Sequence, residues 1–102
     1  MHIFAVFNLK PGVSPADYEK WAKTVDLPTV NALPSIDAFR VFRSTGVLGS
    51  DAKPPFAYIE VLDVNDMDTF LSDVATPAMG EIAAAFGGMV EVTFVTTEEL
   101  TA

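Results

Sequence analysis

The stretch FAYIEVLD, residues 56–63, decides the fold, because it predicts a β-strand with two apolar faces and one acid at its centre. Side chains alternate between the two faces of a strand. One face therefore carries Ala57, Ile59 and Val61, and the other carries Phe56, Tyr58, Glu60 and Leu62. A strand of this kind needs cover on both sides, and a carboxylate inside that cover needs a partner or a function.

The segments on either side of this strand show helix and strand patterns in turn. Strands are predicted at residues 2–9, 36–44, 56–63 and 89–97, where apolar and β-branched residues gather. The first helix begins after Ser14, a capping residue followed by a proline, and is interrupted at Pro28. The second helical region is predicted to begin at a cap at Asn65, to restart at Thr76-Pro77 and to end at Gly87-Gly88.

The order β-α-β-β-α-β predicts an α+β, ferredoxin-like fold: one domain, residues 1–102, with a four-stranded antiparallel sheet. Right-handed crossovers place both helical regions on the same face of this sheet. The other face would expose more apolar surface than monomeric proteins normally tolerate. We therefore expect a homodimer in which two sheets pack face to face, a dimeric α/β barrel. The alternative is a monomer whose 45–55 loop folds over the sheet.

The composition excludes several classes of function. Fourteen acidic and six basic residues give a net charge of −8, so we expect no binding to nucleic acid or to anionic membrane surfaces. No apolar run reaches the roughly 18 residues of a membrane span, and the first residues lack the features of a signal peptide. The chain has no Cys and a single His. We therefore expect a cytoplasmic protein with no metal site and little or no need for a cofactor.

Glu60 has a candidate partner in the preceding strand. If the connecting loop is centred near residue 50, Arg40 lies opposite Glu60 on the same face and forms a cross-strand ion pair. A shift of one residue would place the two side chains on opposite faces. Such a pair can fix the strand register or the dimer. It can also act in a pocket, where Glu60 moves a proton and Arg40 holds an anionic oxygen. Arg43 has the opposite parity and is expected in solvent or at a rim.

Further polar and aromatic side chains are candidates for the same cavity. The catalytic candidates are Glu60, Arg40, Asp26 and His2. Asp26 can project an acid into the cavity mouth, and a histidine has a pKa range suited to proton transfer. The substrate-binding candidates are Trp21, Tyr58, Phe42, Tyr18 and Asn8. Core packing is the alternative role for the two aromatic residues of the first helix, and a turn is the alternative for Asn8.

Three long stretches resemble a known family. LKPGVSPADYEKWAKTVDLP (9–28), ALPSIDAFRVFRS (32–44) and YIEVLDVNDMDTFLSDVATPAM (58–79) are similar to the REDY-like proteins of HapK type. The resemblance runs from Leu9 to Val95 and rests on the spacing of Trp21, Asp26, Pro28, Leu33-Pro34-Ser35, Arg40, Arg43, Glu60 and Thr76-Pro77. It implies a dimeric α/β barrel of ferredoxin-like protomers. It also implies secondary-metabolite chemistry of the prodigiosin type, such as condensation or cyclisation of an aromatic or pyrrolic precursor.

Other members of the superfamily use residues that this chain has only in part. The haem-degrading monooxygenases look similar in architecture and use an Asn, a Trp and a haem-ligating His, whereas the one His here is His2. The polyketide cyclases of stress-responsive barrel type use histidines with a Tyr. We therefore expect a cofactor-independent enzyme of secondary metabolism, with condensation, cyclisation or proton-transfer chemistry on a small aromatic or pyrrolic molecule. The alternatives are a non-catalytic small-molecule binding protein and a cofactor-free monooxygenase.

Overall fold

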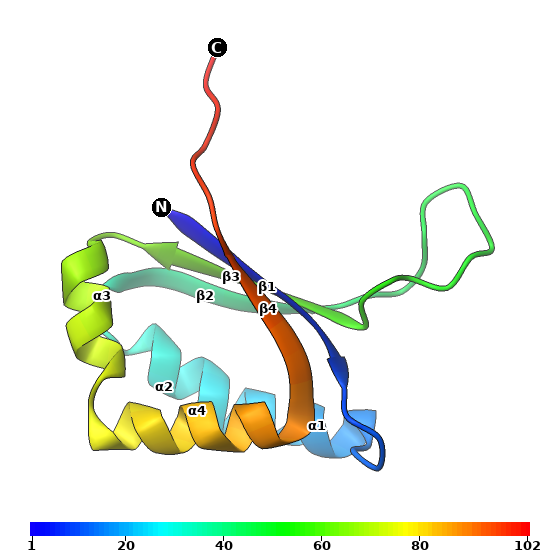
Figure 1. Ribbon diagram of the computed structural model, residues 1–102, viewed down its shortest axis with the longest axis horizontal. Coiled ribbons are helices and arrows are strands. Elements are labelled where there is room, and N and C mark those ends of the chain that lie inside the picture. The colour runs from blue at the N-terminus through cyan, green and yellow to red at the C-terminus, as the bar shows by residue number, and fades with distance from the viewer.

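The computed structural model describes residues 1–102 and contains one sheet with helices on one side only (Figure 1). Strands β1 (His2–Leu9), β2 (Ile36–Arg43), β3 (Tyr58–Val64) and β4 (Val90–Thr96) form an antiparallel sheet in the order β2-β3-β1-β4. The helical segments are α1 (Pro15–Trp21), η1 (Ala22–Asp26), α2 (Leu27–Asn31), α3 (Met67–Val74) and α4 (Pro77–Met89). The predicted α+β, ferredoxin-like order is confirmed.

The first helical region begins as predicted but does not stop at Pro28. The Ser14 side chain accepts a hydrogen bond from the Asp17 N–H at 3.1 Å, which caps α1. The helix then widens into the π-helical turn η1, whose last turn is closed by a Leu27 N–H bond to the Ala22 carbonyl, and continues as α2. Proline lacks an N–H and crowds the carbonyl four residues before it. A π-helical turn relieves both problems, because its hydrogen bonds skip one more residue.

The second helical region differs from the prediction at both ends. Asp66, not Asn65, is the N-cap of α3, and its carboxylate accepts a hydrogen bond from the Thr69 N–H at 3.0 Å. Helix α4 runs through Gly87-Gly88 and ends at Met89. Neither glycine has a positive φ, so neither forms the left-handed cap that commonly stops a helix. The helix ends instead where Val90 takes extended geometry and enters β4.

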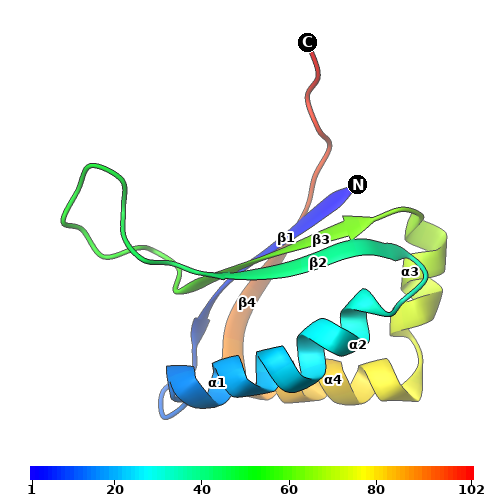
Figure 2. The ribbon, with the colours of Figure 1, turned by 180° about the vertical axis from the view of Figure 1, so that it is seen from behind.

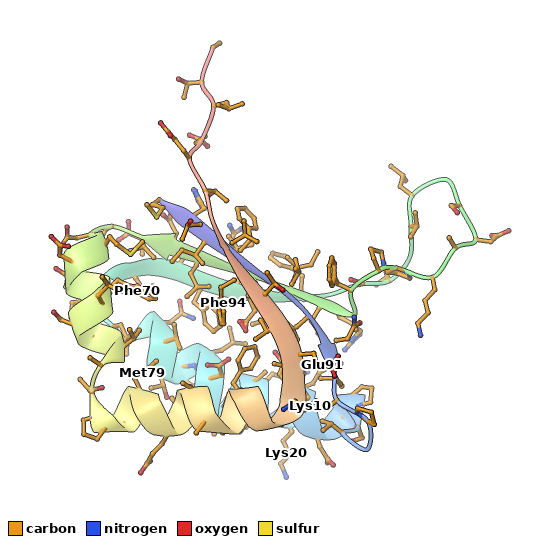
Figure 3. All side chains as sticks on the ribbon, in the orientation of Figure 1. Lys10, Lys20, Phe70, Met79, Glu91 and Phe94 are labelled. Carbon is orange, nitrogen blue, oxygen red and sulfur yellow. The ribbon has the colours of Figure 1, made fainter.

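The helical layer lies on the same side of the sheet when the molecule is seen from behind (Figure 2). Two apolar clusters fill the space between the sheet and the helices. One contains Ile3, Val30, Ile36, Phe39, Leu62, Val64 and Met79. The other is largely aromatic and contains Ala5, Phe7, Tyr18, Ala22, Tyr58, Phe86 and Val90. Lys10 links the end of β1 to α4, since its Nζ donates to the Gly87 carbonyl at 2.7 Å (Figure 3). The aromatic cluster is where the candidate site lies.

The far face of the sheet has no helical cover. Alternation places an apolar group there from all four strands, namely Phe4, Val6, Phe42, Ile59 and Val95. Phe42 is 47% exposed and Val95 is 44% exposed, so this apolar surface is open to solvent in the single chain. The 44–57 loop and the C-terminal residues extend away from the helical layer and leave this surface open (Figure 1).

Candidate active site

The first helical region aims three buried side chains at the sheet. Tyr18, Ala22 and Asp26 follow one another at intervals of four residues, and all three are buried. In a regular α-helix, positions separated by four residues drift slowly around the axis. The wider turn of η1 offsets this drift, so that Asp26 stays on the sheet-facing side with the other two. Such π-helical turns are frequent at functional sites because they redirect a side chain in this way.

Glu60 lies across from these residues, on the helix-facing side of β3. Its neighbours in the sheet are Ala5 on β1 and Val41 on β2, and only 3% of the residue is exposed. Burial raises the pKa of Glu60 to about 8, and the negative charge of Asp26 contributes further. Burial likewise raises the pKa of Asp26 to about 6. No hydrogen bond or positive charge offsets burial at either carboxyl group, which is uncommon for buried acids.

Tyr18 carries the third uncompensated polar group of this region. The residue is fully buried, and its hydroxyl oxygen has no hydrogen-bond partner. Burial, followed by the charges of Glu60 and Asp26, raises the pKa of this hydroxyl far above its ordinary value. Tyr18 therefore stays protonated and is available only as a donor or as a neutral acceptor.

A cavity of about 310 Å³ opens beside Tyr18. It is lined by Tyr18, Glu19, Ala22, Lys23, Leu27, Val41, Phe42, Arg43 and Tyr58. Its volume is at the small end of the range for small-molecule sites. Glu60 and Asp26 are not among the lining residues, so Tyr18 is the member of the acid cluster that meets the cavity directly.

A hydrogen-bonded charged group lines part of this cavity. Arg43 Nε donates to Glu19 Oε2 at 2.9 Å, Arg43 Nη2 pairs with Glu19 Oε1, and Tyr58 Oη donates to Glu19 Oε2 at 2.8 Å. The hydrogen bonds from Arg43 and Tyr58 lower the pKa of Glu19 to about 2. Burial and the bond to Glu19 raise the pKa of Tyr58 to about 12, so this hydroxyl is a fixed donor.

The predicted pair of Arg40 with Glu60 is wrong. In the observed register Arg40 lies opposite Val61, and Val41 takes the position opposite Glu60. The observed strand register differs by one residue from the register assumed for a loop centred at residue 50, which moves Arg40 to the open face. There its guanidinium lies over the Phe42 ring, 5.8 Å from the ring centroid.

The structure brings only some of the other candidates together. Tyr18, Asp26 and Tyr58 join Glu60 between sheet and helices, and Trp21 packs nearby against Phe86. His2 lies on the open face, where its Nε2 is 3.8 Å from Asp63 Oδ2. Asn8 holds the base of the long loop, since it bonds to the Pro55 carbonyl and the Ala57 N–H. Phe42 alternates onto the open face and is also among the residues that line the 310 Å³ cavity.

Glu19, which binds both Arg43 and Tyr58 at the cavity, was not identified from the sequence. The alternation of side chains along β2 could have indicated it, because this alternation places Arg43 on the helix-facing side, opposite Tyr58. An acid one residue after Tyr18 was therefore a possible partner for it. The expectation that Arg43 lies at a rim agrees with its side chain, which is 61% exposed.

Comparison with known proteins agrees with the ferredoxin-like fold. The model of the REDY-like protein HapK family matches residues 1–100. This chain belongs to the HapK family. HapK from Hahella chejuensis has 31% sequence identity to it, and the match covers 100% of this chain and 95% of that chain with a TM-score of 0.75.

Two further structures resemble this HapK-family chain in fold. A dimeric ferredoxin-like protein of unknown function from Thermobifida fusca has 20% identity over 92% of this chain and 85% of its own, with a TM-score of 0.71. SnoaB, a cofactor-independent oxygenase from Streptomyces nogalater, has 19% identity over 97% and 93%, with a TM-score of 0.67. A comparison with curated protein sequences gave no match.

Two other features bear on what the chain can bind. No group of three or more His, Cys, Asp or Glu side chains is placed to hold a metal ion. None of the helices has the length and apolar character of a transmembrane segment.

Proposed function

We propose that this chain is a cofactor-independent enzyme that transfers a proton to a small aromatic or pyrrolic molecule during a condensation or cyclisation. The observation that carries this proposal is the buried carboxyl group of Glu60, which no hydrogen bond or positive charge compensates. An uncompensated buried acid lowers stability, and such groups concentrate at sites where a shifted pKa is used in catalysis.

The shifted pKa values give the three polar groups different protonation states at neutral pH, and therefore different roles. With a pKa near 8, Glu60 holds its proton at neutral pH, close to the value at which a general acid is most effective. Asp26, with a pKa near 6, is mostly ionised at the same pH, and its charge adds to burial in holding the proton on Glu60. Glu60 does not line the cavity, so in this proposal its proton passes through the neutral Tyr18 hydroxyl, which belongs to a cavity-lining residue and has no other hydrogen-bond partner.

The test uses a condensation that needs an acid and reports its own progress. Pyrrole-2-carbaldehyde and 2,4-dimethylpyrrole form a carbon–carbon bond, release one water and give a coloured dipyrrin, which is followed by visible absorbance. We expect the protein to accelerate this reaction and Glu60→Gln to lower the rate by about a hundredfold or more. Glu81→Gln, an exposed site on α4, is the matched control and keeps the full rate. An unchanged rate in Glu60→Gln would refute the proposal.

The two alternatives give different outcomes in the same experiment. A non-catalytic binding protein binds the aldehyde in both the unaltered protein and Glu60→Gln but accelerates the condensation in neither. A cofactor-free oxygenase, the activity stated for SnoaB, consumes oxygen when supplied with 1,4-dihydroxynaphthalene. An oxygen electrode separates this outcome from proton transfer.

We also propose that two copies of the chain pair through the open face of the sheet. Phe4, Phe42, Ile59 and Val95 are each at least 36% exposed in the single chain and form one apolar surface. Covering such a surface is favourable by roughly 25 cal/mol for each Å² removed from water. The T. fusca neighbour, which is dimeric, supports this arrangement for the same fold.

A further inference from the structure

Two cavities meet at the mouth of the candidate site. Besides the 310 Å³ cavity, a larger surface cavity of about 790 Å³ lies between the β1–α1 connection and the base of the 44–57 loop. Glu19, Arg43 and Tyr58 are the three residues that line both. The guanidinium of Arg43 therefore stands where a molecule enters the inner cavity.

Arg43 keeps unused hydrogen-bonding capacity at this position. A guanidinium has five N–H donors, and Arg43 uses its Nε and its Nη2 on Glu19. The remaining donors make no hydrogen bond to Glu19; they lie near the Tyr58 hydroxyl, and the side chain is 61% exposed to solvent. Glu19, held also by Tyr58 at 2.8 Å, fixes the orientation of the guanidinium without consuming its other donors.

The lining of the inner cavity carries more positive than negative charge. Arg43 and Lys23 line it together with one acid, Glu19, whereas Glu60 and Asp26 lie on the buried side and are not lining residues. The chain as a whole has a net charge of −8, so this lining differs in sign from the average of the molecule. A molecule with one negative group and an apolar ring is therefore favoured with the ring against Tyr18 and Val41 and the anion at Arg43.

We propose that Arg43 binds the carboxylate of an aromatic monocarboxylate whose ring occupies the 310 Å³ cavity. This inference rests on the proposed function for the location of the ring, but not for the proton transfer by Glu60. Arginine suits the role, because its planar donors match the two oxygens of a carboxylate. Arg43 is thus assigned as a specificity-determining residue, and Glu19 positions it.

The test compares two probes of the same shape, indole-3-acetate and indole-3-acetamide, by isothermal titration calorimetry. We expect the acid to bind at least about tenfold more tightly than the amide, as a partly exposed charge-assisted contact allows. Arg43→Gln should reduce this ratio to about one while leaving amide binding unchanged, and circular dichroism verifies its folding. Lys20→Gln removes a cation on the side of α1 that faces away from the sheet (Figure 3). This variant should keep the ratio of acid to amide affinity.

Three outcomes would overturn the assignment. Equal binding of acid and amide by the unaltered protein would exclude an anion subsite, whether or not the variant folds. Retention of the preference in Arg43→Gln would assign it to another cation. Failure of both probes to bind at millimolar concentration would exclude aromatic monocarboxylates from the cavity. Glu60→Gln separates the two proposals: it should keep the preference for the acid even though it loses turnover.

Discussion

The buried acids make the stability of this protein fall as the pH rises, and Glu60→Gln should remove most of that effect. The pKa of Glu60 rises from its ordinary value of 4.5 to about 8 on folding, so the folded state holds the proton more tightly than the unfolded state. The contribution of Glu60 to stability is then fully present below pH 4.5 and is lost as the pH rises toward 8. For Glu60 this amounts to about 2.5 kcal/mol between pH 5 and pH 7.

Asp26 acts in the same direction with a smaller effect. Its pKa rises from 3.8 to about 6, which adds a loss of about 1 kcal/mol over the same interval. Together the two groups are large relative to the total stability of a domain of this size. The unaltered protein should therefore unfold at a clearly lower urea concentration at pH 7 than at pH 5.

Urea titrations at pH 5 and pH 7, at one fixed protein concentration, measure this difference directly. The comparison uses the change between the two pH values, because a buried glutamine amide has an unfavourable burial term of its own. Glu60→Gln should reduce the change to the Asp26 contribution of about 1 kcal/mol or less. Glu81→Gln is the control and should keep the full change. A protein whose stability stays constant or rises from pH 5 to pH 7 would refute the assignment of Glu60 as a buried, uncompensated acid.

The remaining predictions concern the open face and the helical layer. Ile59→Asp places a charge in the apolar surface and should reduce the particle measured by light scattering from twice 11.0 kDa to 11.0 kDa; an 11.0 kDa particle for the unaltered chain would exclude the dimer. Ser35→Ala removes a buried hydroxyl that donates to Asp73 Oδ2 at 2.6 Å. It should lower the free energy of unfolding by about 1–2 kcal/mol in urea titrations, and an unchanged value would show that this bond contributes nothing.

The sheet-facing pattern of the chain was predictable because it depends on local periodicity. Alternation placed Tyr58 and Glu60 on one face of β3 and Ile59 on the other, and the structure agrees. The Ser14 cap of α1 also follows from the local sequence, since a cap needs only a few consecutive residues. The predicted cap at Asn65 was wrong. Two adjacent residues there can both cap a helix, and Asp66 adopts the extended geometry that the cap position requires.

The pairing of Arg40 depended on a quantity that no local pattern contains. The length and shape of the 44–57 loop set the register of β2 against β3, and an offset of one residue exchanges the faces of every side chain in a strand. Arg43, not Arg40, therefore meets the helical layer, and its partner Glu19 comes from an element 24 positions earlier. The π-helical turn η1 likewise carries no sequence signature apart from Pro28, yet it directs Asp26 toward Glu60.

By itself, the sequence determined the order of strands and helices along the chain and the two apolar faces of the sheet, since both follow from short-range periodicity; the family was indicated by resemblance to known proteins. Only the tertiary structure decided which charged groups meet. It brought Glu60, Asp26 and Tyr18 into one uncompensated cluster and left Arg40 outside it. The physical reason is that burial and electrostatic pairing depend on strand register and helix rotation, and both are set by packing between segments far apart in the chain.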